Sequence, residues 1–397
     1  MICLQVHNDY QIVGGETKTA QKIADLLEKN EIEVIRYYKS NRQFESAGKI
    51  KKAMVGIRAL YNRETVREIK ALLKERRVDF ALIHNTSPLI SNSIYRILVK
   101  QRVPIIKYLQ NYNLICLNGA LDQGKICEAC QKRAFRGVIK KCYKNSYIFS
   151  YIKLLMKWDM QKHYLNKVTA FMANSDYVRR QYIKAGVVQD KICVMYNYIE
   201  NICQTGQQGL ERNSFLYFGR ISREKGVFTV LKAFGELRHL QLRILGNGEL
   251  VEELQDYIDS NRMDNVIYLG SKTGEELENE IYRAKWVIVS SEWDEPLPRT
   301  ILEAYAKGTP VIGTDRGGIP EMIREGRTGF IYEGGNGDAL IAALRQADTL
   351  SGDEYEQMRR HCQEEVEEQY TEERYMERFI GCLEKILKSN DEGIKKI

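Results

Sequence analysis

The chain has 397 residues, of which 44% are hydrophobic and 28% charged. This composition is typical of a soluble globular protein large enough for two domains, and it excludes disordered and fibrous classes. No apolar run reaches the roughly 18 residues of a membrane span, and the start of the chain lacks signal-peptide features. We therefore expect a cytoplasmic protein with its nine cysteines reduced. Residues 1–200 carry 35 Lys and Arg against 17 Asp and Glu, whereas residues 201–397 carry 25 against 36, so the first half is expected to face an anionic partner.

The first half alternates between short apolar runs and amphipathic segments. The expected strands are 2–6, 33–38, 80–84, 105–109, 171–174 and 192–196, and the expected helices include 16–29, 63–75 and 91–100. Such alternation predicts a mostly parallel sheet covered on both faces.

A second alternating series follows a polar, glycine-bearing segment, 203–209, which has the composition of a linker. Its expected strands are 215–218, 242–245, 266–269, 286–290, 310–313 and 329–332, and residues 354–388 have helical periodicity. The predicted fold class is α/β, with two Rossmann-like doubly wound domains facing a cleft. We place the domains at 1–200 and 201–375, with a last helix, 376–397, returning to the first domain.

Two glycine-bearing loops follow predicted strands. Gly14 and Gly15 precede the first helix, where backbone N–H groups and the helix N-terminus suit an anion, although a plain turn explains them equally well. In the loop from Gly219 to Gly226, Arg220 offers a fork of donors to a phosphate and Lys225 a point charge. A solvated basic loop is the alternative.

Two glutamates, Glu295 and Glu303, bracket seven residues at a strand-to-helix junction, with Pro298 expected at the first helical position. The carboxyl edge of a parallel sheet is where ligands bind, and acceptor-only carboxylates suit ligands rich in hydroxyl groups. The alternative is a charged loop and a solvated helix face. His84 also ends a predicted strand and is a candidate ligand contact, and His7 is a weaker one.

Cysteines cluster in one loop-like region, with Cys127 and Cys130 in a C-x2-C spacing and Cys116 and Cys142 flanking them. Four thiolates could hold a structural zinc, and buried idle thiols are the alternative. The following stretch, 133–167, interleaves basic and aromatic residues. It suits an anionic membrane surface, or else a helix that packs on its own domain. No motif supports nucleic-acid binding.

Together these motifs resemble the family 4 glycosyltransferases of the GT-B fold, most closely those of bacterial surface-polysaccharide biosynthesis. The resemblance covers nearly the whole chain and rests on Gly219-Arg220, Lys225-Gly226, Glu295 to Glu303, and the runs Gly308-Thr309-Pro310 and Gly317-Gly318-Ile319-Pro320-Glu321. It implies a retaining hexosyltransferase that uses a UDP- or GDP-sugar. The acceptor would be a saccharide or an undecaprenyl-linked saccharide bound by the first domain, at the inner face of the cell membrane.

The resemblance also implies roles for individual residues. Glu303 would bind the ribose hydroxyls, Glu295 would bind the donor sugar, and Arg220 and Lys225 would hold the diphosphate without a metal ion or cofactor. Gly15 would place a backbone N–H near the phosphate from the opposite domain, and His84 would lie by the transferred sugar.

One departure from the family pattern lies between the two glutamates. Pro296 and Pro298 cannot donate backbone hydrogen bonds, so any backbone contact to the sugar would come from Leu297 or Arg299. A nucleotide-sugar 2-epimerase of the same fold and a non-catalytic sugar-nucleotide binding module are the alternative functions.

Overall fold

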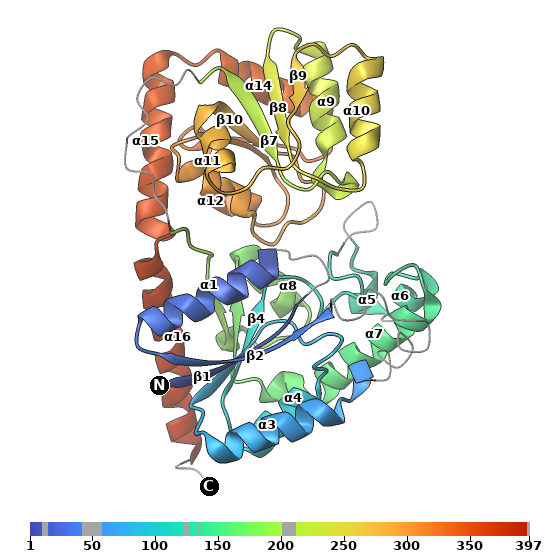
Figure 1. The fold of residues 1–397 in the computed structure, drawn as a ribbon, viewed down its shortest axis with the longest axis vertical. Coiled ribbons are helices and arrows are strands. Elements are labelled where there is room, and N and C mark those ends of the chain that lie inside the picture. Colours follow the sequence, from blue (N-terminus) through green and yellow to red (C-terminus); the bar gives the residue numbers. More distant parts are fainter. Residues whose placement is uncertain (10–14, 42–57, 122–126, 134, 201–211, 395–397) are drawn as a thin grey trace. The chain divides into compact units, whose positions relative to one another are not determined.

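The computed structural model describes residues 1–9, 15–41, 58–121, 127–133, 135–200 and 212–394 (Figure 1). The chain divides into two compact units. The N-terminal unit comprises the described residues of 1–121, 127–195 and 378–394, and the C-terminal unit comprises those of 196–377. The predicted linker, 203–209, and Gly14 lie outside the described residues.

The N-terminal unit is built on a six-stranded parallel sheet in the order β2-β1-β3-β4-β5-β6. The strands are β1 (Ile2–Asp9), β2 (Glu33–Ser40), β3 (Phe80–Ile83), β4 (Ile105–Leu109), β5 (Ala170–Ala173) and β6 (Ile192–Val194). The helices are α1 (Gly15–Lys29), α3 (Arg63–Glu75), α4 (Ser93–Lys100), α5 (Ala129–Lys132), α6 (Arg136–Ile139), α7 (Tyr147–Asp159) and α8 (Asp176–Lys184). The strand order reverses between β1 and β3, so their carboxyl ends form the switch point where such sheets bind ligands.

The C-terminal unit repeats the design in the order β12-β11-β10-β7-β8-β9, also parallel. Its strands are β7 (Ser214–Phe218), β8 (Gln241–Leu245), β9 (Val266–Tyr268), β10 (Ala284–Val289), β11 (Val311–Thr314) and β12 (Gly329–Tyr332). Its helices are α9 (Val227–Glu236), α10 (Val251–Ser260), α11 (Gly274–Arg283), α12 (Arg299–Tyr305), α13 (Ile319–Met322), α14 (Gly337–Asp348) and α15 (Gly352–Gln369). Here the order reverses between β7 and β10.

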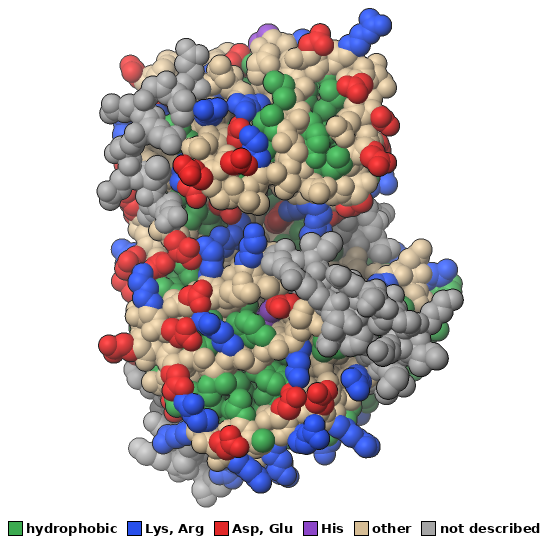
Figure 2. Space-filling view, viewed as in Figure 1, with side chains coloured by type: hydrophobic (Ala, Val, Ile, Leu, Met, Phe, Trp, Pro, Cys, Tyr) green, Lys and Arg blue, Asp and Glu red, His purple; other side chains and the backbone are tan. Residues whose placement is uncertain are grey.

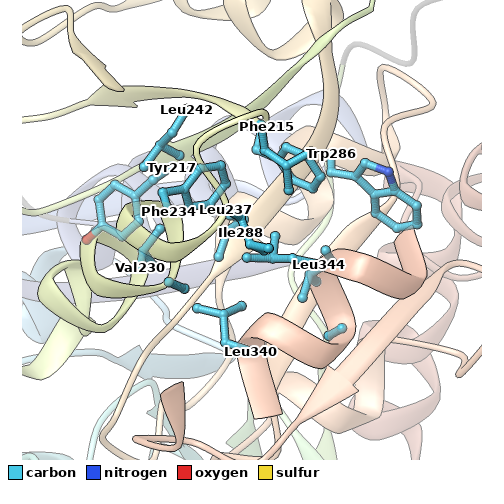
Figure 3. Close-up of a cluster of buried hydrophobic side chains, with 14 of the residues drawn as sticks. Phe215, Tyr217, Val230, Phe234, Leu237, Leu242, Trp286, Ile288, Leu340 and Leu344 are labelled. Atoms are coloured by element: carbon cyan, nitrogen blue, oxygen red, sulfur yellow. The ribbon is translucent and has the colours of Figure 1, made fainter. Parts of the chain in front are cut away.

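The core of the C-terminal unit shows why these strands are nearly continuous apolar runs. Both faces of the sheet are covered, so neighbouring side chains on a strand are buried on opposite sides. Phe215 and Trp286 pack with Phe234 of α9 and Leu344 of α14 on one face (Figure 3). On the other face Leu216 and Val287 belong to a second buried cluster that includes residues of α12.

The predicted helix over residues 354–388 is two helices, α15 and α16 (Glu372–Ile394). The break at Tyr370 and Thr371 contains neither glycine nor proline. Tyr370 is buried, and the Thr371 hydroxyl accepts the backbone N–H of Arg374 at 3.2 Å, which starts the new helix. From Arg378 on, α16 belongs to the N-terminal unit, where Phe379 meets Phe80 of β3.

The surface of the N-terminal unit carries charges of both signs, with basic side chains gathered near its lower edge in Figure 2. Across the ranges that the structure describes, no helix is long and apolar enough to cross a membrane.

Candidate functional site

The loops after β7 and β10 carry the predicted donor-binding residues. These strands are parallel neighbours, with Leu216 opposite Val287 and Tyr217 opposite Ile288. Their carboxyl ends therefore emerge side by side at the switch point of the sheet, the position at which sheets of this class bind ligands.

Hydrogen bonds to its backbone hold the loop after β7 in place. The Tyr217 hydroxyl donates to the Arg220 carbonyl at 2.8 Å, and the N–H of Ile221 donates to the Asn247 carbonyl at 2.9 Å. Gly226 has φ of 68°, and a Cβ there would lie 2.1 Å from the Ser290 carbonyl oxygen, so only glycine lets the two loops pack together. The Arg220 side chain is 65% exposed, with its guanidinium 3.8 Å from Glu224.

Lys225 and Glu295 form a close ion pair. The Nζ of Lys225 lies 2.7 and 2.5 Å from the two carboxylate oxygens of Glu295, and the Ser291 hydroxyl donates to one of them at 2.6 Å. Burial acts to raise the pKa of Glu295, but attraction and hydrogen bonding from Lys225, with Ser291, outweigh it and hold the pKa below its usual value. Glu295 is therefore a carboxylate at neutral pH.

A third loop holds the backbone of Glu295. Gly317, after β11, has φ of 60°, and a Cβ there would lie 2.2 Å from the Glu295 carbonyl oxygen. The N–H of the next residue, Gly318, donates to that same oxygen at 2.7 Å. The glycine pair of the sequence motif thus allows the close approach that positions the carboxylate.

The residues between the glutamates have different surroundings. Leu297 is buried in the apolar cluster with α12, so its side chain has a packing role. Pro298 is the N-cap and not the first helical residue, because α12 begins at Arg299. The Nε of Arg299 lies 3.7 Å from Glu303 one turn later, and both side chains are partly exposed. Leu297 and Arg299 remain predictions as backbone contacts to a sugar.

In the N-terminal unit, His84 follows β3 and is fully buried. Gln5 donates its Nε2 protons to the Ala20 carbonyl at 2.9 Å and to His84 Nε2 at 3.0 Å. With Nε2 accepting, the ring proton of His84 is on Nδ1, which has no partner among the described residues. Burial, with His7 and Lys107 nearby, lowers the pKa of His84 well below its usual value, so the ring is neutral.

A pocket with a cavity volume of about 60 Å³ opens beside His84. Its wall comprises Glu16, His84, Asn85, Thr86, Ser87, Asn92, Tyr95, Lys107, Tyr108, Leu109, Asn111, Asn113, Leu114, Lys153, Met156, Lys157, Met160 and Tyr182. Apart from His84, sequence reasoning missed these residues as site residues. Of these residues, Lys107 could have been noticed in the sequence, because it is a charged residue within the otherwise apolar strand β4.

The remaining predicted residues are placed as follows. Gly15 is exposed at the start of α1, with open space where a Cβ would be. His7 is buried, and its Nε2 contacts the Thr17 hydroxyl at 3.0 Å and Asp9 at 3.3 Å. Sequence reasoning also missed Ser291, which lies two residues after the end of β10 and donates a hydrogen bond to the Glu295 carboxylate.

Among the four cysteines Cys116, Cys127, Cys130 and Cys142, burial raises the pKa of the Cys142 thiol to about 11, with the other three thiols adding to the shift. Cys130 is buried against Leu117 and Val138, and Cys116 donates to Asn118 at 2.8 Å. Within the described ranges, no three His, Cys, Asp or Glu side chains are arranged to hold a metal ion. The zinc site stays a prediction.

Comparison with known proteins finds a family match within the C-terminal unit. Residues 200–369 match the family model described as "Glycosyl transferases group 1". An uncharacterized 41.2 kDa protein of the cps region of Klebsiella pneumoniae is 27% identical over 50% of this chain and 60% of its own length. Lipopolysaccharide 1,2-N-acetylglucosaminetransferase of Salmonella typhimurium is 29% identical over 41% of this chain and 46% of its own. The chain thus spans about half the length of the curated relatives it matches.

Among solved structures, HepE of Anabaena in complex with UDP and glucose covers 97% of this chain, and this chain covers 99% of it, with a TM-score of 0.68 and 17% sequence identity. That likeness shows the fold and confirms the predicted class of two parallel α/β sheets of the GT-B type. The chain therefore has a GT-B fold, and residues 200–369 within it match the glycosyl transferases group 1 model.

Proposed function

We propose that the protein is a retaining, metal-independent glycosyltransferase. It would move a hexose from a UDP- or GDP-sugar to a saccharide, or to an undecaprenyl-linked saccharide, in polysaccharide biosynthesis. The observation that carries the proposal is the Lys225–Glu295–Ser291 constellation at the switch point of a group 1 domain. The UDP and glucose in the HepE structure, and the activity named for the Salmonella relative, support a nucleotide-sugar donor.

In the proposed reaction the bond between the anomeric carbon and the diphosphate oxygen breaks. The acceptor hydroxyl oxygen bonds to that carbon, and its proton leaves with the nucleoside diphosphate. Arg220 and Lys225 stabilise the charge that develops on the leaving diphosphate. Glu295 accepts hydrogen bonds from the donor sugar and Glu303 from the ribose, since ionised carboxylates are acceptors only. His84, in the N-terminal unit, would lie by the transferred sugar.

The decisive experiment is a thermal-shift screen of the purified chain against UDP-, GDP-, ADP- and dTDP-sugars. A specific donor binds only the folded state and raises the melting temperature. The same donor incubated with chelator and no acceptor should give at most slow hydrolysis. Interconversion of two sugars would instead identify an epimerase. Unchanged turnover in Glu295→Ala would contradict the assigned role of Glu295. Donor binding without turnover in the wild-type protein would instead indicate a binding module.

We further propose that the N-terminal unit binds an anionic membrane surface from the cytoplasmic side. Residues 129–158 contain no acidic residue, and large apolar side chains are exposed along α6 and α7. They are Phe135, Ile139, Tyr147, Ile148, Tyr151 and Trp158, each at least 47% exposed. Aromatic and aliphatic side chains among lysines match the boundary between headgroups and acyl chains.

Co-sedimentation with vesicles tests this surface. Wild-type protein should bind vesicles with anionic lipid and not vesicles of phosphatidylcholine alone. The double variant Ile148→Ser and Trp158→Ser should lose that binding, whereas Ile267→Ser, at an equally exposed position of the C-terminal unit, should keep it. Equal binding to both vesicle types would contradict an electrostatic membrane contact.

A further inference from the structure

The pocket beside His84 contains an excess of positive charge. Three lysines, Lys107, Lys153 and Lys157, line it together with one carboxylate, that of Glu16. In the described part of the chain, no carboxylate lies within 4.0 Å of the Nζ of any of these lysines. Lys107 and Lys157 are buried and Lys153 is partly buried. Lysines in this number without a paired carboxylate are unusual, because burial disfavours the charged form.

The hydrogen bonds inside the protein leave donors unused. Lys107 donates to the carbonyls of Ile83 and His84, and Lys153 donates to the Ser87 hydroxyl at 3.2 Å. An ammonium group has three donors, so Lys107 keeps one and Lys153 keeps two. The Nδ1–H of His84 is a further buried donor without a partner among the described residues. Lys157 is different, because the Ile115 and Cys130 carbonyls, at 2.7 and 3.1 Å, hold its Nζ.

These lysines stay largely charged near neutral pH. Burial lowers the pKa of Lys107 to about 8, with Glu16 opposing the shift. Burial also lowers the pKa of Lys153 to about 8, and Glu16 opposes while Lys144 adds to that shift. With neutral His84 and one carboxylate, the pocket keeps a net positive charge at pH 7.

Helix α7 joins this pocket to the exposed apolar surface. Lys153, Met156 and Lys157 recur at helical spacing and line the pocket, whereas Tyr147, Tyr151 and Trp158 recur on the opposite face and are exposed. A group bound at the pocket therefore lies across one helix from the surface that we propose meets the membrane.

We propose that this pocket binds a phosphoryl group carried by the acceptor, with Lys107 and Lys153 supplying the charge and His84 Nδ1–H a directed hydrogen bond. The inference rests on the proposed transferase function and specifies the acceptor as a phosphate or pyrophosphate ester. The phosphoryl group has two possible sources, a soluble sugar phosphate and a lipid-linked pyrophosphate, which share the chemistry that the pocket recognises.

The test measures binding of inorganic pyrophosphate by calorimetry to full-length protein carrying Lys225→Gln, which weakens the diphosphate contact in the C-terminal unit. We expect saturable binding that is roughly 10- to 100-fold weaker when Lys153→Gln is added, because a charge-assisted hydrogen bond is lost. Adding Lys153→Met should have the same effect and guards against misfolding of the glutamine variant. Lys162→Gln, an exposed lysine just beyond α7, is the matched control and should leave the affinity unchanged.

Two further arms distinguish the sources. Glucose 1-phosphate represents a soluble ester, and geranylgeranyl pyrophosphate in micelles represents a lipid-linked one. Tighter binding of either arm, lost with Lys153→Gln, supports the pocket and names the source. Absence of pyrophosphate binding, or binding equal in the Lys153 variants and the control, would overturn the proposal.

The transferase proposal is scored separately, by the thermal shift that nucleotide-sugars give to wild-type protein and to Lys153→Gln alone. Donor stabilisation in both proteins without lysine-dependent pyrophosphate binding would overturn only the pocket. Lysine-dependent pyrophosphate binding in a protein that no nucleotide-sugar stabilises would overturn the transferase.

Discussion

The two units treat buried and partly buried lysines in contrasting ways. In the C-terminal unit the ammonium group of Lys225 is held between the oxygens of Glu295, so the charges are balanced before any ligand arrives. In the N-terminal unit Lys107 and Lys153 donate only to uncharged oxygens. A balanced pair orients two functional groups at a modest cost in stability, whereas unbalanced charge costs stability until an anion binds. The contrast predicts opposite responses when a lysine is removed.

Removing the balanced lysine should have the largest effect. Lys225→Met takes away a charge that we propose stabilises the leaving diphosphate, and we expect kcat/KM to fall roughly 100- to 1000-fold. Lys232→Met, an exposed position on α9, is the control and should keep wild-type rates. Steady-state kinetics with the donor found by thermal shift would measure both, and a loss below tenfold would contradict the leaving-group role.

The glycine that supports Glu295 comes next. In Gly317→Ala, a Cβ at 2.2 Å from the Glu295 carbonyl oxygen forces that loop to move, with an expected loss of about 2–4 kcal/mol in the free energy of unfolding. Gly335 shares the left-handed backbone, with φ of 82°, but a Cβ added there would meet no atom within 4 Å. Gly335→Ala is therefore the matched control. It should cost only about 1 kcal/mol, from backbone strain alone. Urea unfolding of the two variants separates crowding from strain.

The contribution of the Lys225–Glu295 ion pair to stability should depend on pH in the acid range. Because the folded-state pKa of Glu295 lies below its unfolded value, the stability that the pair contributes is present above the unfolded pKa and is lost as pH falls through the folded one. Lys225→Met should therefore be less stable than wild type by about 1–3 kcal/mol at pH 7. The difference in the free energy of unfolding between the two proteins should become smaller below about pH 4. A gap independent of pH would show that packing, and not charge, accounts for it.

The smallest effect is expected in the pocket, with the opposite sign. The folded-state pKa of Lys153, about 8, lies below its unfolded value, so the unfolded chain binds more protons between about pH 8 and 10.5. Wild-type stability at this residue thus rises with pH through that window. Lys153→Met should be more stable than wild type at pH 7 by about 1 kcal/mol, since the side chain is only partly buried and solvent screens the shift.

This gain should disappear near pH 10, when Lys153 of the wild type is neutral. Lys107, Lys144, Glu16 and Tyr143, whose ring faces Lys153, are present in both proteins, so only their coupling to Lys153 enters the difference. Unfolding in urea at pH 7 and pH 10 makes the measurement. A variant less stable than wild type at pH 7 would contradict unbalanced charge in the pocket.

The sequence was sufficient to predict both sheets and to place the candidate residues of the C-terminal unit in loops that follow strands. The strands are apolar runs between helical segments, a pattern that can be read from the sequence alone. Arg220 and Lys225 lie in the glycine-bearing loop directly after β7, and Glu295 lies in the loop after β10. The pairing of Lys225 with Glu295 could not be predicted, because it depends on β7 and β10 becoming neighbours although 70 residues separate the two side chains.

The lysine pocket was beyond sequence reasoning for a different reason. The stretch 133–167 was interpreted as a basic surface, and half of α7 fits that interpretation. The other half turns Lys153 and Lys157 inward, and helical periodicity alone does not distinguish a buried lysine from a solvated one when apolar residues lie on both faces. The break between α15 and α16 was missed similarly, since no glycine or proline marks it.

Helix α16 has a consequence for how the protein is made. The N-terminal sheet is complete by Val194, yet Phe379, which packs against Phe80, is synthesised only after the whole C-terminal unit. During translation part of the apolar surface of the N-terminal unit therefore stays uncovered until α16 has left the ribosome. An isolated N-terminal fragment ending near residue 195 would expose the same surface permanently, and α16 must be supplied with it to obtain a well-behaved protein.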